Sequence, residues 1–148
     1  MQLKTASEVI SFVKELEEYS ARFYQELAQR DIGDSETWLS FVKENRKNII
    51  QIERAYYGVI TDALEGCFAF DINRDEFTPK TKLPPEVSYA QALNQAVKME
   101  EKIIEFYSDA AEQSKLLMAD VPRAFVMIAR KRDSRISMLK SLLGKGDS

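Results

Sequence analysis

Apolar residues recur at alternating steps of three and four positions through four segments of the chain. This is the period of an α-helix that buries one face, whereas the two-residue alternation of a half-buried strand is nearly absent. The pattern therefore predicts an all-α fold with helices at about 6–30, 36–57, 89–114 and 121–143.

Short sequence signals mark the ends of these helices. Thr5 with Glu8, and Ser88 with Gln91, have the spacing of capping boxes at the starts of the first and third helices. Gly144 lies where a C-terminal cap of the fourth helix is expected. The segment before Thr5 is expected to lead straight into the first helix.

The long connection at about 59–87 differs from the helical segments in its composition and residue pattern. It is rich in turn-forming residues and shows no sustained helical period, so we expect a crossover with one short helix near 61–66. Short, long and short connections predict an antiparallel four-helix bundle, and the length of the chain predicts a single domain over 1–148.

The two halves of the chain repeat one another. The first helix shifted by 83 positions onto the third, and the second shifted by 87 onto the fourth, align specific residues and not only apolar ones. The matches include Glu17 with Glu100, Glu18 with Glu101, Phe23 with Phe106, Tyr24 with Tyr107, Trp38 with Phe125 and Ile49 with Ile136. The two helical hairpins are therefore predicted to be pseudo-duplicates.

Polar residues interrupt the apolar stripe of each predicted helix. They are Glu17 on the first, Asn45 and Asn48 on the second, Glu100 on the third, and Arg132 and Arg135 on the fourth. We expect these six to be buried together. In the alternatives, the glutamates are solvated because the helix phase is off by one residue, and the arginines belong to a basic face with Arg130 and Lys131.

The motifs EEYSARFY at 17–24 and EEKIIEFY at 100–107, with aromatic residues Trp38 and Phe125 opening the second and fourth helices, resemble the rubrerythrin-type branch of the ferritin-like superfamily. The resemblance covers all four helices. It implies two iron or manganese ions, held by one Glu from each of the first and third helices and a Glu-x-x-His from each of the other two.

This chain departs from that pattern at the metal positions. Glu17 and Glu100 match the first and third helices, but the two Glu-x-x-His positions fall on Asn45 with Asn48 and on Arg132 with Arg135. Arginine has no lone pair for a metal and stays protonated. We therefore expect no metal and no cofactor, and a buried network in which the arginines pair with the glutamates and the asparagines complete the hydrogen bonds.

Two tyrosines occupy the family's positions beside the metal cavity. The resemblance implies that Tyr24 and Tyr107 can donate a phenol hydrogen bond to a carboxylate. Simple packing in the core is the more common role of such residues, and it is the one we expect.

Composition excludes several kinds of site. The chain has no histidine and one cysteine, so it lacks a Ser-His triad, an internal disulfide and a rubredoxin-type iron centre. Cys67 lies in the crossover with no partner thiol, and we do not expect it to be reactive. The 21 basic and 24 acidic residues give a net charge of −3, which argues against nucleic-acid and membrane partners. Without an apolar run or signal-peptide pattern, a cytoplasmic protein is expected.

Three functions are compatible with these residues. The favoured one is a non-catalytic bundle that acts as a structural or interaction protein. An alternative is an oxidoreductase or metal carrier that binds iron or manganese at an all-oxygen site, built from Glu17 and Glu100 with Glu44, Asp133 or Glu18. The weakest is a small-anion site at Arg132 and Arg135. The resemblance also makes a homodimer the expected state.

Overall fold

The computed structural model describes residues 2–59, 68–79, 82–115 and 120–146. Its elements there are the strands β1 (Gln2–Thr5) and β2 (Phe68–Asn73), the long helices α1 (Ala6–Gln29), α2 (Ser35–Val59), α5 (Tyr89–Ser114) and α6 (Asp120–Gly146), and the short helix α4 (Arg74–Phe77). The prediction of a mainly helical chain is confirmed, and the long helices begin and end within three residues of the predicted bounds.

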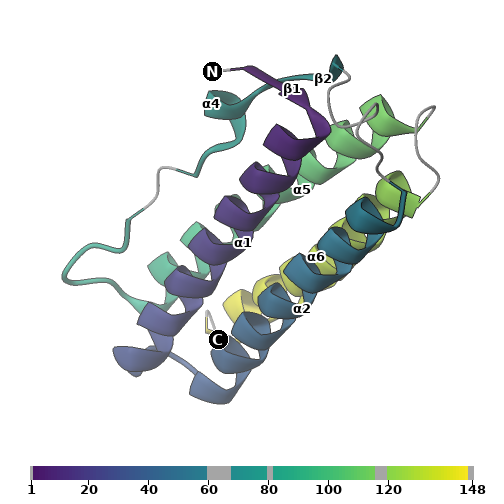
Figure 1. Cartoon of the computed structure of the whole chain (residues 1–148). Helices are drawn as coiled ribbons and strands as arrows, with labels where there is room; N and C mark the ends of the chain where they lie inside the picture. The colour runs from purple at the N-terminus through teal and green to yellow at the C-terminus, as the bar shows by residue number, and fades with distance from the viewer. Residues whose placement is uncertain (1, 60–67, 80–81, 116–119, 147–148) are drawn as a thin grey trace.

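The four long helices lie side by side as two antiparallel hairpins, α1 with α2 and α5 with α6 (Figure 1). The hairpins meet where α2 contacts α6 and α1 contacts α5. The described part of the segment between β2 and α5 runs along the outside of α1, on the side away from α2 and α6 (Figure 1). The described residues of the crossover therefore cover part of α1, and none of the described segments lies over the outer surfaces of α2 and α6.

Both predicted capping boxes are present. The Thr5 hydroxyl accepts from the Glu8 backbone N–H at 3.1 Å, and the Glu8 carboxylate accepts from the Thr5 N–H at 3.0 Å. Ser88 and Gln91 make the same pair of bonds at the start of α5.

The predicted end of the fourth helix before Gly144 is wrong, since α6 continues to Gly146. Gly144 does not adopt the positive φ of a C-terminal cap, so the helix continues through it.

The turn between α1 and α2 requires its glycine. Gly33 has φ +75°, and a Cβ there would lie 2.6 Å from the Tyr89 ring at the start of α5. The Trp38 indole N–H donates to the Ile32 carbonyl oxygen at 2.5 Å and fixes the other side of the turn. The close approach of Gly33 to Tyr89 therefore ties the first hairpin to the second.

The structure also contains a small sheet that the sequence pattern did not predict. β1 and β2 form an antiparallel pair in which Leu3 lies opposite Ile72, with an irregularity between Leu3 and Thr5. A short alternation was present, since Leu3 and Ile72 are buried while Lys4 and Asp71 are exposed. The short helix expected near 61–66, and Cys67, lie outside the described residues.

The outer edge of β2 is filled by a side chain of α5. The Asp71 backbone N–H donates to the Gln113 side-chain oxygen at 2.7 Å, and the Gln113 amide donates back to the Asp71 carbonyl at 3.2 Å. This pair of bonds imitates a neighbouring strand. It attaches the small sheet to α5 and closes an edge at which another chain could pair.

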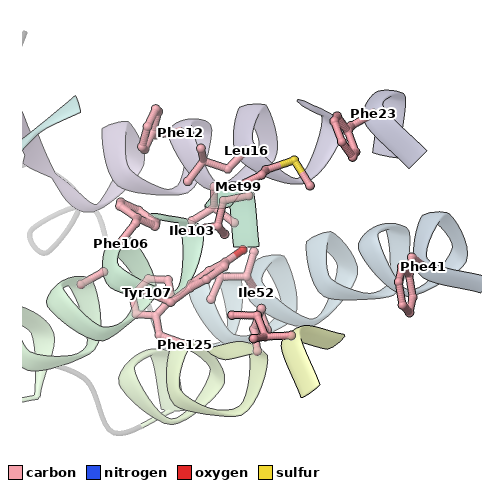
Figure 2. Packing of buried hydrophobic residues seen from close by; sticks show 14 of the residues in the cluster. Phe12, Leu16, Phe23, Phe41, Ile52, Met99, Ile103, Phe106, Tyr107 and Phe125 are labelled. Atoms are coloured by element: carbon pink, nitrogen blue, oxygen red, sulfur yellow. The ribbon is translucent and has the colours of Figure 1, made fainter. Parts of the chain in front are cut away.

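The hydrophobic core runs between the four long helices, and Figure 2 shows side chains from all of them within it. Many of its aromatic rings meet edge to face, as in the pair Phe12 and Phe106, whose centroids are 5.1 Å apart, whereas Tyr24 stacks on Trp38. The Leu83 side chain from the crossover is buried as well. Within the described residues, no helix combines the length and the apolar character needed to cross a membrane.

Candidate functional site: a buried ionic network

The middle of the apolar core contains a set of buried polar side chains. The structure brings all six positions predicted from the sequence into it, one set from each long helix. The buried polar or charged residues found in the described part of the chain are Glu17, Ser20, Asn45, Asn48, Glu100, Ser114, Arg132 and Arg135. All except Ser114 share hydrogen bonds with one another.

Arg132 lies at the centre of this network. One terminal nitrogen of its guanidinium donates to Glu17 Oε2 at 2.7 Å, and the other donates to Glu100 Oε2 at 2.5 Å. All three side chains have 0% exposure. A cation from α6 thus bridges one carboxylate from α1 and one from α5, and these are strong, charge-assisted hydrogen bonds.

The two tyrosines cross between the hairpins. Tyr24 of α1 donates its phenol proton to Glu100 of α5 at 2.7 Å, and Tyr107 of α5 donates to Glu17 of α1 at 2.5 Å. Both rings are fully buried. The expectation that they only pack is therefore wrong, because each packs and also satisfies a buried carboxylate.

Arg135 extends the network toward the surface. It donates to Glu100 Oε1 at 3.2 Å, to Glu44 Oε1 at 2.9 Å and to the Phe41 carbonyl oxygen at 2.9 Å. Its guanidinium carbon lies 4.8 Å from the centre of the Phe41 ring, within the range of a cation–π contact. The Glu44 side chain is 35% exposed, so it forms the solvent-facing end of the network.

The two asparagines have separate partners. Asn45 donates to the Ser20 hydroxyl at 3.2 Å, and Asn48 donates to Glu17, with both carboxylate oxygens at 3.4 Å. The Lys131 ammonium reaches the Asn48 side-chain oxygen at 3.5 Å from the rim. Ser20 is not among the six polar positions predicted from the sequence, since a small hydroxyl group does not stand out in an apolar pattern.

The charges hold one another ionised. Burial alone raises the pKa of Glu100, but the positive charges of Arg132 and Arg135 and the Tyr24 hydrogen bond outweigh burial and lower it. Burial likewise lowers the pKa of Arg132, and the charges of Glu100 and Glu17 outweigh it and raise that pKa well above its usual value. The buried site is therefore an ion network and not a set of neutral acids.

The tyrosines are held in the opposite way, as neutral donors. Burial, and then the negative charge of the neighbouring carboxylate, raise the pKa of Tyr24 and of Tyr107 well above the value of a free phenol. Each phenol thus keeps its proton, and its hydrogen bond to the carboxylate, to a higher pH than a free phenol would.

These shifts predict that the unfolding free energy falls at both ends of the pH scale. Below about pH 5 the unfolded chain takes up a proton at Glu100 before the folded chain does, because the folded pKa is lower. Above about pH 10 the unfolded chain loses the protons of Tyr24 and Tyr107 first, because their folded pKa values are higher. Urea denaturation at pH values across this range measures both arms.

A variant separates the alkaline arm from general effects of high pH. Tyr24→Phe with Tyr107→Phe removes the two phenols, so the decline above pH 10 should be shallower than in the parent protein. An unchanged decline would show that these tyrosines do not cause it.

The metal centre that the family resemblance implies does not fit these residues. The carboxylate oxygens of Glu17 and Glu100 that face the middle of the site are taken by the guanidinium of Arg132, which cannot coordinate a cation and repels it. Among the described residues, no cluster of three or more His, Cys, Asp or Glu side chains is arranged to hold a metal ion.

The all-oxygen alternative is not assembled either. Glu18 and Asp133 are exposed, and Glu44 is turned to Arg135. The small-anion alternative needs arginines with free terminal nitrogens, whereas every terminal nitrogen of Arg132 and Arg135 has a partner. Of the side-chain nitrogens of these two arginines, only Arg132 Nε is buried without a hydrogen-bond partner.

Comparisons of the chain with models of protein families, with curated proteins and with solved structures found no match.

Proposed function

We propose that the chain is a ferritin-like four-helix bundle of the rubrerythrin type that has no catalytic role and acts as a structural or interaction protein. In this proposal a buried ionic network stands where proteins of that type hold two metal ions. The observation that supports this proposal most strongly is the fully buried Arg132 guanidinium. Its terminal nitrogens lie 2.7 Å from Glu17 Oε2 and 2.5 Å from Glu100 Oε2.

Charge balance supports this proposal. In the family pattern, four carboxylates meet two divalent cations, so the charges of ligands and metals cancel. Here two buried carboxylates meet two buried guanidiniums, and their charges cancel without a metal. A divalent cation entering this site would add charge that no free carboxylate compensates, so the network itself opposes metal binding.

Elemental analysis tests the proposal. The protein is produced with iron and manganese supplements, and is then loaded anaerobically with Fe(II) and exposed to air. We expect much less than one metal ion per chain, since the carboxylates that would bind it are already paired.

The control is Glu17→Gln, which keeps the shape of the side chain but removes its charge. Binding of about two metal ions per parent chain that is lost in this variant would overturn the proposal and make the protein an oxidoreductase candidate. Circular dichroism of both proteins shows that any difference in metal content comes from folded protein.

A further inference from the structure

The long helices divide the charge of the molecule unevenly. α1 and α5 each carry five acidic and two basic residues. α2 carries four basic and three acidic residues, and α6 carries seven basic and two acidic residues. Because α2 and α6 are in contact, one side of the protein is basic although the net charge of the chain is −3.

Seven exposed cations on that side form no salt bridge. Within the described residues, the exposed basic side chains of α2 and α6 that form no salt bridge are Lys43, Arg46, Lys47, Arg54, Arg123, Arg130 and Lys140. Elsewhere on the described surface Lys4, Arg30, Arg74 and Lys115 are each paired with a carboxylate, whereas Arg22, Lys82, Lys98 and Lys102 form no salt bridge. Among the described residues, seven of the eleven exposed basic side chains without a salt bridge therefore lie on α2 and α6.

The exposed apolar side chains lie on the same two helices. The large hydrophobic residues that the structure leaves exposed, by 38% to 66%, are Leu39, Ile50, Tyr57, Val126, Met127 and Met138. On α2, Leu39, Ile50 and Tyr57 are 11 and 7 residues apart, which places them on one stripe about 27 Å long. We call these apolar and basic side chains together the α2–α6 face.

A groove continues this face on the far side of α6. Its volume is about 720 Å³, and it lies between α5 and α6. Ile104, Ala111 and Val126 contribute apolar surface, and the charged residues that line the groove are Lys115, Arg123, Arg130, Glu112 and Asp133. A concave site with three basic and two acidic residues therefore lies beside the α2–α6 face.

We propose that the α2–α6 face binds an acidic, amphipathic helix of a partner protein. Carboxylates of such a helix match the unpaired lysines and arginines, and its apolar side chains match the exposed stripe and fill the groove. This inference rests on the proposed function only in treating the chain as a binding protein, since the face is separate from the buried network.

Other occupants match the face less well. A second copy that presented the same face would bring like charges together, and the acidic helices α1 and α5 show no large exposed apolar side chain among their described residues. The phosphate backbone, which supplies most of the affinity of nucleic acid for a basic surface, offers no apolar contact for the Leu39 and Ile50 side chains. A lipid surface is too flat to enter the groove between α5 and α6.

Binding of a designed peptide tests the proposal. The probe is a fluorescent helix of about 18 residues, with leucine at positions i, i+3, i+4 and i+7 and glutamate at most others, and its control carries lysine in place of glutamate. We expect saturable binding of the acidic peptide and no binding of the basic one, both measured by fluorescence anisotropy.

Charge reversal on the face tests the same proposal. Lys47→Glu with Arg54→Glu should weaken binding of the acidic peptide about tenfold or more. The matched control, Arg22→Glu with Lys98→Glu, changes the charge equally on α1 and α5 and should leave the affinity unchanged.

Methionine methyl groups report the place of binding. With ¹³C-methyl methionine, the signals of exposed Met127 and Met138 should move on addition of the acidic peptide, while that of buried Met99 should not. No binding, equal binding of the basic peptide, or movement of the two signals only on self-association or with phosphatidylserine vesicles would overturn the proposal. Peptide binding and metal content are separate measurements, so this inference and the proposed function can fail independently.

Discussion

Replacing Arg132 with methionine is expected to lower the unfolding free energy by about 3 to 5 kcal/mol. The substitution leaves the carboxylates of Glu17 and Glu100 fully buried without their shared cation. A buried charge that loses its partner keeps the cost of desolvation and loses the attraction that offset it. Urea denaturation followed by circular dichroism measures the change.

Two further variants make this result specific. Arg130→Met removes an exposed arginine from the same helix and should change the unfolding free energy by about 0.5 kcal/mol or less. Adding Glu17→Gln and Glu100→Gln to Arg132→Met removes the uncompensated charges and should recover part of the lost stability, even if the single variant does not fold. Equal effects of Arg132→Met and Arg130→Met would mean that the network contributes nothing to stability.

Introducing the ligand set of ferritin-like proteins is expected to create a metal site. The combined substitutions Asn45→Glu, Asn48→His, Arg132→Glu and Arg135→His supply four carboxylates and two imidazoles with Glu17 and Glu100. Such a set binds about two iron or manganese ions per chain in ferritin-like proteins. We therefore expect metal content to rise from negligible to about two ions per chain, and the melting temperature to rise on addition of Mn(II).

This experiment has its own control. Adding Glu17→Gln to the four substitutions removes one bridging carboxylate and should lower both the metal content and the Mn(II)-dependent stabilisation. A variant that binds no metal, or that does not fold even when metal is supplied, would show that the helices do not hold these positions as the ferritin-like geometry requires. The parallel between the network and a di-metal site would then be wrong.

The helical pattern of the sequence was sufficient to predict which polar residues enter the core. Burial follows the phase of an amphipathic helix, and a charged residue on an apolar stripe stands out, as Glu17 and Glu100 do. The internal repeat strengthened the assignment, because the same interruption recurs in both hairpins. The cations on the fourth stripe, Arg132 and Arg135, were identified in the same way.

The features that the sequence did not predict depend on how far a side chain extends and on which distant segments of the chain pair. Glu44 is rotated about 100° from the stripe, yet the long Arg135 side chain reaches it. The crosswise donation by Tyr24 and Tyr107 depends on how the two hairpins are aligned, which the phase of a single helix does not specify. The short strands were missed because pairing between distant segments decides whether so few residues form a sheet.

The Arg132 bridge also restricts how the helices can be aligned along their axes. Sliding α6 by one helical turn moves the guanidinium about 5.4 Å, out of reach of both Glu17 and Glu100. Leucine, isoleucine and phenylalanine can find new apolar neighbours after such a slide. The ionic contacts cannot be replaced, because a slide in one direction puts Ile128 near the place of Arg132, and a slide in the other takes Arg135 away from Glu44 and the Phe41 carbonyl. The network therefore selects one register from those that the apolar surfaces alone would tolerate.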